Sequence, residues 1–255
     1  MTDALRLAFG TLTAVPVPPP RRVDARVAGP AMLWAPVVTL VVGLPVVVAH
    51  VAVRWLGVPP LLAAALALGA TAWATRGIHL DGLADTADGL ASGLDRERAL
   101  AVMRRGDVGP AGVTALVVAH LVDLACLDVL LRSGSGTVAA VVAVAASRHT
   151  LAWGCRAGMP PARPGGLGAA VAGSVSRPRL AVAFVVMLGT ACAATVVAGA
   201  GWAAGGGAVA AAVAAGWVLQ RRARRRLGGI SGDVLGAGVE VGMGAALAVA
   251  ATVLG

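Results

Sequence analysis

Residues 79–90 read HLDGLADTADGL and stand directly after a hydrophobic run. The chain has only 12 Asp and Glu residues, and three of them, Asp81, Asp85 and Asp88, fall within this stretch. Carboxylates this close repel each other, and the repulsion costs free energy unless a positive group lies between them. A metal ion is the simplest such group.

If residues 81–95 are helical, the three aspartates lie on one narrow stripe, because positions i, i+4 and i+7 share a helix face at about 100° per residue. Leu83 and Leu90 then fall on the opposite side. Oxygen ligands suit a hard cation such as Mg²⁺ or Mn²⁺, which binds a few carboxylates and completes its shell with water and substrate phosphate. The stretch therefore predicts a metal site; the alternative is a solvated acidic face on a loop.

The composition indicates an integral membrane protein. Of the 255 residues, 58% are hydrophobic and 13% are charged, whereas soluble domains carry about 25% charged residues. The net charge of +9 comes from arginine alone, since the chain has no lysine. In a membrane chain such a charge reflects topology and contact with headgroups or phosphates, so we expect no nucleic-acid partner.

Hydrophobic runs of about 20 residues predict an all-α, polytopic membrane helix bundle, with residues 1–255 as a single domain. We expect about seven transmembrane helices (six to eight), near residues 31–53, 58–76, 109–131, 137–153, 180–199, 202–219 and 234–254. Residues 1–27 contain a short amphipathic segment that is expected at the membrane interface. The longest polar loop, residues 77–108, contains the acidic stretch and is the predicted active-site loop.

Arginine placement predicts the orientation of these helices, because arginine favours cytoplasmic loops. With the N-terminus inside, 18 of the 21 arginines fall in inner segments. Arg54 and Arg132 lie in outer turns, and Arg148 lies within a predicted span. We therefore expect a protein of the cytoplasmic (inner) membrane whose N-terminus and active site face the cytoplasm.

Arginines that follow the acidic stretch are candidates for binding phosphate. Arg104 and Arg105 could grip phosphate oxygens with their guanidinium forks, and contact with lipid headgroups is the alternative. A charge at the depth of Arg148 is expected to be functional or paired. Arg148 is thus predicted either to bind substrate or to form a structural pair with Asp123.

A second candidate carboxylate site lies near the end of the chain. Asp233 and Glu240 are seven residues apart and hence on one helical face, after a run of five arginines between residues 221 and 226. We predict that Asp233 contacts a metal or a phosphate. Its alternative role is to cap the N-terminus of the last helix.

Four stretches also follow one another in a recognisable order. They read FGTLTAVP at residues 9–16, HLDGLADTADG at 79–89, RPGGLG at 163–168 and GISGDVLG at 229–236. In this order they resemble the cobalamin synthase family, adenosylcobinamide-GDP ribazoletransferase, over nearly the whole chain. Residues 104–112 depart from the family pattern, because they read RRGDVGPAG where the family often reads KDSRIGTYG, so the roles of that arginine and tyrosine are not carried over.

The resemblance implies the last joining step of the coenzyme B12 nucleotide loop. The 3′-hydroxyl of α-ribazole, or of its 5′-phosphate, attacks the β-phosphorus of adenosylcobinamide-GDP, and GMP leaves. The implied cofactor is Mg²⁺. Phosphoryl transfer of this kind requires mainly charge neutralisation and alignment.

Our hypothesis assigns these roles to the residues singled out above. The metal ligands are Asp81, Asp85, Asp88 and Asp233, and one aspartate, Asp88 in the first instance, also serves as the base. The substrate-binding residues are His79, Arg104, Arg105 and Arg148. The expected partners are the two substrates and the lipid bilayer, with a second copy of the chain or other cobalamin-assembly enzymes as further candidates.

Two other classes of protein remain open. A CDP-alcohol phosphotransferase of lipid synthesis also uses a membrane-embedded aspartate cluster, but here no arginine follows Gly82-Leu83-Ala84 and the aspartate spacing differs. An ion-coupled transporter would favour acids at the middle of the membrane. In this chain the main cluster is predicted at the cytoplasmic rim.

Overall fold

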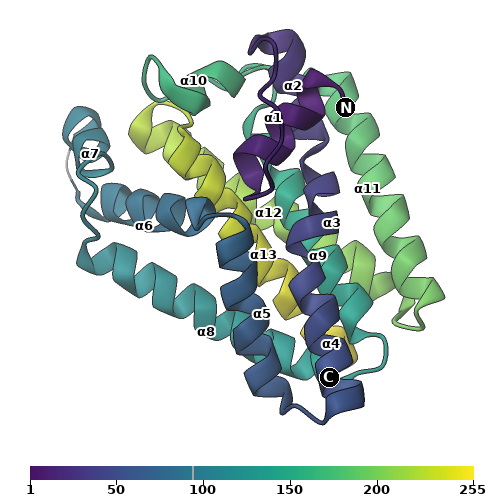
Figure 1. The fold of residues 1–255 in the computed structure, drawn as a ribbon. Helices are drawn as coiled ribbons and strands as arrows, with labels where there is room; N and C mark the ends of the chain where they lie inside the picture. The colour runs from purple at the N-terminus through teal and green to yellow at the C-terminus, as the bar shows by residue number, and fades with distance from the viewer. Residues whose placement is uncertain (94) are drawn as a thin grey trace.

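The computed structural model describes residues 1–93 and 95–255, and this part of the chain consists of helices joined by turns and loops, without a strand (Figure 1). The predicted all-α fold is confirmed. The helices are α1 (Asp3–Leu12), α2 (Ala25–Leu33), the 3₁₀ helix η1 (Ala35–Val38), α3 (Thr39–Val42), α4 (Leu44–Leu56), α5 (Pro60–Ala74), α6 (Ile78–Ala91), α7 (Arg96–Val102), α8 (Pro110–Arg132), α9 (Gly136–Gly154), α10 (Gly166–Val171), α11 (Arg177–Val197), α12 (Gly201–Leu227) and α13 (Gly232–Leu254).

The centre of the bundle is formed by α9 and α13. Helix α13 packs against α6, α8, α9 and α12, and α9 also packs against α11 and α12. Small residues allow this closeness: a Cβ added at Gly216 of α12 or at Gly242 of α13 would stand 3.0 Å from Cγ2 of Thr150 on α9. Helices in a membrane associate through such close packing, because lipid is as apolar as their side chains.

Five helical segments of the described chain are long and apolar enough to cross a membrane. They are Ala35–Leu56, Pro110–Arg132, Arg177–Val197, Gly201–Leu227 and Gly232–Leu254, and the bent pair α5 and α6 gives a sixth if the two helices are counted together. The predicted span 137–153 corresponds to α9, which is buried along most of its length and so presents little surface to lipid. The count of seven and the cytoplasmic N-terminus stay predictions.

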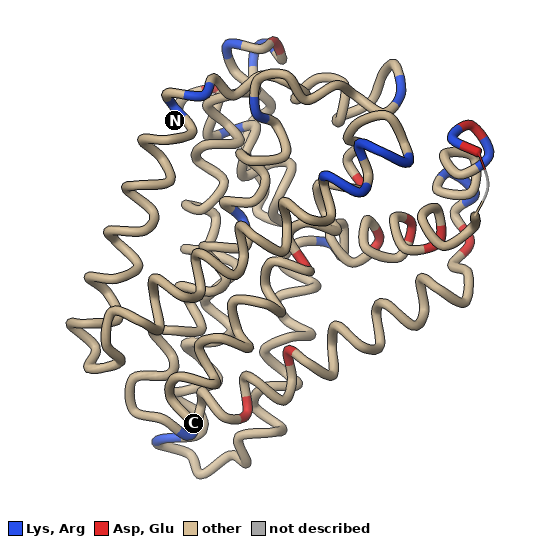
Figure 2. The backbone as a smooth tube through the Cα atoms, turned by 180° about the vertical axis from the view of Figure 1, so that it is seen from behind, with Lys and Arg blue, Asp and Glu red and all other residues tan. Residues whose placement is uncertain are grey.

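Charge is distributed unevenly along the bundle. Most arginines lie at the end that holds the N-terminus, whereas the C-terminus lies at the opposite end (Figure 2). The segment 1–27 lies at the arginine-rich end and contains α1 and the start of α2; Leu7, Ala8 and Leu12 of α1 are buried, and α1 packs against α2 and η1. Its position at a membrane interface stays a prediction.

A right-angled corner separates α5 from α6. The two helices meet at 89°, because Arg76 and Gly77 both adopt left-handed backbone conformations, with φ of 56° and 68°. This conformation strains a residue other than glycine. It is held by hydrogen bonds that Nη2 of Arg76 donates to the carbonyl oxygens of Gly10 (2.8 Å) and Thr11 (3.2 Å). Helix α6 therefore runs across the bundle and does not continue the path of α5.

The acidic helix is shorter than predicted. It ends at Ala91, and Gly93 with φ of 68° follows in the left-handed conformation that commonly terminates helices. Asp95, predicted within the same helix, instead caps α7 by accepting a hydrogen bond from the N–H of Arg98 (3.0 Å). Residue 94 of the predicted helix lies outside the described residues.

Glycines let the backbone of α6 touch that of α13. A Cβ at Gly82 would stand 2.6 Å from the carbonyl oxygen of Asp233, and a Cβ at Gly236 would stand 3.1 Å from Cα of His79. Real Cβ atoms do not approach other atoms to 2.6 Å, so a larger residue at Gly82 would push the two helices apart.

We predict that Gly82→Ala lowers the free energy of unfolding by about 1–3 kcal/mol, because overpacking forces the backbones to shift. The matched control is Gly69→Ala in α5, where a Cβ meets nothing within 4 Å and the better helix propensity of alanine applies. Thermal unfolding of both variants in detergent checks this prediction. Equal melting temperatures for the two variants would contradict it.

Candidate active site

A cavity of about 410 Å³ lies where α1, α6, α10 and the start of α13 meet. Its lining contains residues from all four stretches of the sequence singled out above. They are Thr11 and Leu12 from the first, His79 and Asp81 from the second, Arg163, Gly165, Gly166, Leu167 and Gly168 from the third, and Ile230, Ser231, Gly232, Asp233, Leu235 and Gly236 from the fourth. Segments far apart in the chain thus form a single site.

Backbone hydrogen bonds join the residues just before the third stretch to the fourth stretch. The N–H of Ala162 donates to the carbonyl oxygen of Ile230 (2.7 Å), and the N–H of Ile230 donates to that of Pro160 (3.0 Å). A Cβ at Gly168 would stand 2.7 Å from Cα of Ser231. The glycine at position 168 is therefore required for α10 to lie against the start of α13.

Two carboxylates line the cavity, one from each of two helices. Asp81 comes from α6 and is exposed, and Asp233 comes from the first turn of α13. Oδ2 of Asp233 accepts a hydrogen bond from the hydroxyl of Ser231 (3.1 Å) and lies 3.7 Å from Nη2 of Arg163. Ser231 also caps α13, as its Oγ accepts the N–H of Val234. The N-cap of α13 is thus Ser231, and not Asp233 as the alternative prediction had it.

Asp85 lies in the field of the other aspartates. Burial, followed by the negative charges of Asp81, Asp233 and Asp88, raises the pKa of Asp85 to about 6, against a smaller opposing effect of Arg163. Asp81 of the predicted stripe shares the cavity with Asp233, and Asp85 is close enough to both for their charges to affect it. Around Asp85 the negative charge of these aspartates outweighs the positive charge of Arg163.

Asp88 is placed differently from the other aspartates of α6. Its Oδ2 accepts a hydrogen bond from the N–H of Gly109 (2.7 Å) and its Oδ1 one from the N–H of Gly112 (2.8 Å). These N–H groups belong to the N-terminus of α8, which is otherwise without a side-chain cap. A carboxylate is favourable there because it satisfies free donors at the positive end of the helix dipole. Asp88 thus joins α6 to α8.

The carboxylates fit a magnesium ion that is bound mainly by substrate and water. Among the described residues, no three His, Cys, Asp or Glu side chains are arranged to hold a metal by themselves. Magnesium does not need such a cage, because it commonly takes one or two carboxylates together with water and substrate phosphate. Asp81 and Asp233 have the right chemistry for this. The predicted ligand set with Asp85 and Asp88 stays a prediction.

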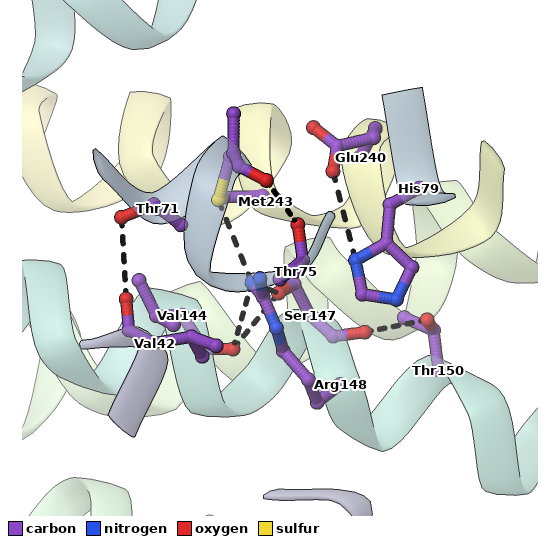
Figure 3. A network of polar contacts seen from close by, with 11 residues as sticks. Val42, Thr71, Thr75, His79, Val144, Ser147, Arg148, Thr150, Glu240 and Met243 are labelled. Atoms are coloured by element: carbon purple, nitrogen blue, oxygen red, sulfur yellow. Dashed lines mark hydrogen bonds and ion pairs between the residues drawn. The ribbon is translucent and has the colours of Figure 1, made fainter. Parts of the chain in front are cut away.

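His79 is a buried polar group on the cavity wall. Its side chain is 3% exposed, and Nδ1 lies 3.9 Å from Oε1 of Glu240, as Figure 3 shows. Neither ring nitrogen has a hydrogen-bond partner in the described part of the chain. Burial, and secondly the charge of Arg148, lowers the pKa of His79 to about 3, so the ring is neutral. Both ring nitrogens are buried, and Nδ1 faces Glu240, so the predicted contact of His79 with substrate stays a prediction.

Arg148 lies in the interior of the bundle and does not line this cavity. Its Nη1 donates to Oγ of Ser147 (2.8 Å) and to the carbonyl oxygen of Val144 (3.4 Å), as Figure 3 shows. With Asp123 and Glu240 it lines a small space of about 20 Å³. Of the two predicted roles for Arg148, this position favours structural pairing in the interior over contact with substrate.

Arg104 and Arg105 lie outside the cavity. Arg104 lines a neighbouring hollow of about 390 Å³ together with Arg96 and Arg163, so a ligand that extends past Arg163 could reach it. Arg105 is exposed and lines neither space. The predicted phosphate contacts of both residues stay predictions.

Sequence reasoning did not single out Arg163 and Arg76, although both line the cavity. Arg163 belongs to the quoted RPGGLG stretch, where only the glycines drew attention. Its Nη1 is buried and has no hydrogen-bond partner among the described residues. Arg76 sits at the corner described above, and no local signal marks an arginine for a left-handed conformation. Together these residues make the cavity suited to a phosphorylated ligand that is held by arginine, carboxylates and a divalent ion.

Comparison with known proteins gives consistent matches over the whole chain. Residues 4–251 match the family model described as cobalamin-5-phosphate synthase. A protein named adenosylcobinamide-GDP ribazoletransferase from a Nocardioides species is 44% identical over 247 residues, which cover 97% of each chain. Proteins of the same name from Frankia casuarinae and Pseudomonas aeruginosa are 38% and 37% identical, covering 96% and 94% of this chain and 93% and 96% of their own. No solved structure matches the chain significantly.

We predict that Asp88→Ala destabilises the fold, whereas Asp88→Asn is milder because its amide oxygen still accepts one N–H. The loss of a helix cap costs about 1–2 kcal/mol. Thermal unfolding of both variants measures the effect. If Asp88→Ala unfolds at the wild-type temperature, Asp88 does not hold the start of α8.

We predict that Asp85→Asn, unlike Asp88→Ala, stabilises the fold in the absence of divalent ions. The pKa of Asp85 is about 6 in the folded state against 3.8 for the free side chain, so ionisation opposes folding, and the cost develops as the pH rises from about 4 to 6. The carboxyl is largely solvated, so we expect a gain on the order of 1 kcal/mol for the variant at pH 7.5 and none below pH 4. Melting curves at both pH values test this, and a destabilised variant at pH 7.5 would contradict it.

Proposed function

The chain belongs to the cobalamin-5-phosphate synthase family, and on this premise we propose that its cavity joins α-ribazole, or α-ribazole 5′-phosphate, to adenosylcobinamide-GDP with release of GMP. The product is adenosylcobalamin or its 5′-phosphate. The chain is thus an enzyme, a transferase of cobalamin nucleotide-loop assembly. Family membership sets aside the phosphotransferase of lipid synthesis and the ion-coupled transporter.

One observation carries the proposal: four stretches that are far apart in sequence line a single cavity together with Asp81, Asp233 and Arg163. A volume of about 410 Å³ suits a small ligand such as a nucleoside with a phosphate. A corrinoid macrocycle is too large for this space. We therefore place the nucleoside and the reacting diphosphate in the cavity and the corrin ring outside it.

Charged side chains bind the diphosphate in this arrangement. Asp81 and Asp233 would hold Mg²⁺, which when bound supplies charge neutralisation on the phosphate oxygens. The guanidinium of Arg163 belongs to a side chain that lines the cavity and is 30% exposed, and it would donate to a phosphate oxygen. Its contact with Asp233 at 3.7 Å keeps the arginine directed toward the cavity. Charge-assisted hydrogen bonds of this kind are the strong ones at a phosphate site.

The attacking hydroxyl must lose a proton as the new phosphodiester bond forms. We assign this proton to Asp85, which lies one helical turn beyond the cavity-lining Asp81 on the same face of α6 and has a pKa raised to about 6, close to working pH. Asp88, the base first predicted, already accepts backbone N–H groups of α8 with both oxygens and does not line the cavity. A hydrogen bond from His79 to the nucleoside would require its buried ring to turn toward the cavity that it helps to line.

The distribution of arginine supports a proposal for the location of the site. We place the cavity on the cytoplasmic side of the inner membrane, because most arginines lie at the end of the bundle that holds the N-terminus (Figure 2) and α1 helps to line the cavity. Its substrates would then reach it from the cytoplasm. Association with a second copy of the chain or with other enzymes of the same assembly sequence stays a prediction.

The experiment is to incubate purified protein in detergent with adenosylcobinamide-GDP, α-ribazole and Mg²⁺, and to measure GMP and the joined corrinoid by mass spectrometry. We expect Asp81→Asn and Asp233→Asn each to lower the rate at least about 100-fold, as losses of groups that stabilise transition-state charge do. Asp107→Asn is the control, because this exposed carboxylate in the same polar loop does not line the cavity. It should keep the wild-type rate.

A second readout separates metal binding from catalysis. Mg²⁺ should raise the melting temperature of the wild type and of Asp107→Asn, but not of the Asp81→Asn, Asp233→Asn double variant. An unchanged rate in both single variants would refute the carboxylate mechanism. Absence of the joined product with wild-type protein would refute the proposed reaction.

A further inference from the structure

A second hollow, separate from the cavity, lies between α6 and the end of α12. It measures about 760 Å³ and is lined by Leu90, Trp217, Val218, Arg221, Arg222, Arg225 and Arg226. None of these residues lines the active-site cavity. Leu90 lies nine residues after Asp81, which at about 100° per residue places it on the opposite face of α6. This hollow, called the basic groove below, is therefore distinct from the site of the reaction.

The lining of the basic groove changes from apolar to basic along α12. Residues 217, 221 and 225 form one row at a spacing of four, and residues 218, 222 and 226 form a second row. Each row begins with a partly exposed apolar side chain, Trp217 or Val218, and continues with two arginines. One face of the helix thus passes from apolar to strongly positive within a single turn.

Three arginines of the basic groove have no carboxylate partner in the part of the chain that the structure describes. In the described part of the chain, Arg221, Arg222 and Arg225 form no ion pair with a carboxylate, and no acidic residue lines the hollow. The guanidinium of Arg221 stacks over the ring of Trp217 at 5.1 Å. This contact directs the arginine along the groove wall and leaves its charge available.

The point at which α12 changes from apolar to basic residues corresponds to the edge of a membrane. Helix α12 is long and apolar enough to cross a bilayer, and its arginines end it. Tryptophan favours the level of the headgroups, and basic pockets between membrane helices bind anionic headgroups. A molecule that complements this face carries an anionic phosphate attached to apolar chains.

We propose that the basic groove binds one anionic phospholipid, with its phosphate at Arg221, Arg222 and Arg225 and its acyl chains along Trp217 and Val218. The lipid would contact Leu90, and hence the side of α6 that faces away from the cavity. Bilayer lipid would in this way support the helix that carries the active-site aspartates. The proposal does not depend on which reaction the cavity performs.

Native mass spectrometry of the delipidated protein with added phosphatidylglycerol tests the proposal. We expect one tightly retained lipid, and binding about 100-fold weaker in the triple variant Arg221→Gln, Arg222→Gln, Arg225→Gln, since each arginine near an anionic headgroup contributes about a factor of five. The matched control is Arg21→Gln, Arg26→Gln, Arg177→Gln, which removes three exposed charges outside the groove. It should bind as the wild type does. An equal loss of lipid binding in both triple variants would mean that the lipid is attracted only by the overall positive charge, and would overturn the proposal.

Two further measurements locate the lipid and identify it. Phosphatidylglycerol brominated near the headgroup should quench the fluorescence of the wild type more than that of Trp217→Phe; equal quenching would place the lipid elsewhere. Glycerophosphoglycerol, the same headgroup without chains, should fail to displace the lipid at equal concentration. If it competes equally well, the groove binds a free phosphate ester and the lipid proposal is wrong. Phosphatidylcholine should bind weakly, and tight binding of it would likewise contradict the role of charge.

Discussion

The backbone contact between α6 and α13 is the constraint on which the rest of the structure depends. It requires glycine at positions 82 and 236, where a Cβ would meet the partner helix at 2.6 and 3.1 Å. The contact also requires the 89° corner before α6, because only a helix that crosses the bundle can meet the first turns of α13. Once it is made, His79 and Asp81 stand beside Ser231 and Asp233 at one cavity.

This contact brings the aspartates of α6 and α13 close together, and the neighbouring groups neutralise some of these aspartates more than others. Asp88 is satisfied by the N-terminus of α8. Asp233 is held by Ser231 and approached by Arg163. Among the described residues no hydrogen bond or ion pair to Asp85 is found, and burial together with the neighbouring aspartates raises its pKa. The imbalance is therefore concentrated where a cation and a diphosphate are proposed to bind, and stability is given up there for binding.

Elsewhere in the molecule, charged residues lie either in the interior of the bundle or at the edge of its apolar surface. In the interior, Arg148 lies near Glu240 and Asp123, beneath His79. Charged side chains at this depth need partners inside the protein, because exposing them to lipid is costly. The end of α12 carries Arg221, Arg222 and Arg225 at the edge of the apolar surface, and no carboxylate of the described residues forms an ion pair with these three. The same residue type thus serves in the interior, at the cavity and at the membrane edge, and its surroundings decide which role it has.

The sequence by itself determined the all-α membrane bundle, the acidic helix and the stretches that form the cavity, because hydrophobic periodicity and short motifs are local properties. Only the tertiary structure decided that Asp88 caps α8, that Arg148 lies beneath the cavity and that Arg163 lines it. It also decided the left-handed corner at Arg76. Helical spacing tells which residues share a face, but which element covers that face depends on packing between segments that are distant in the chain.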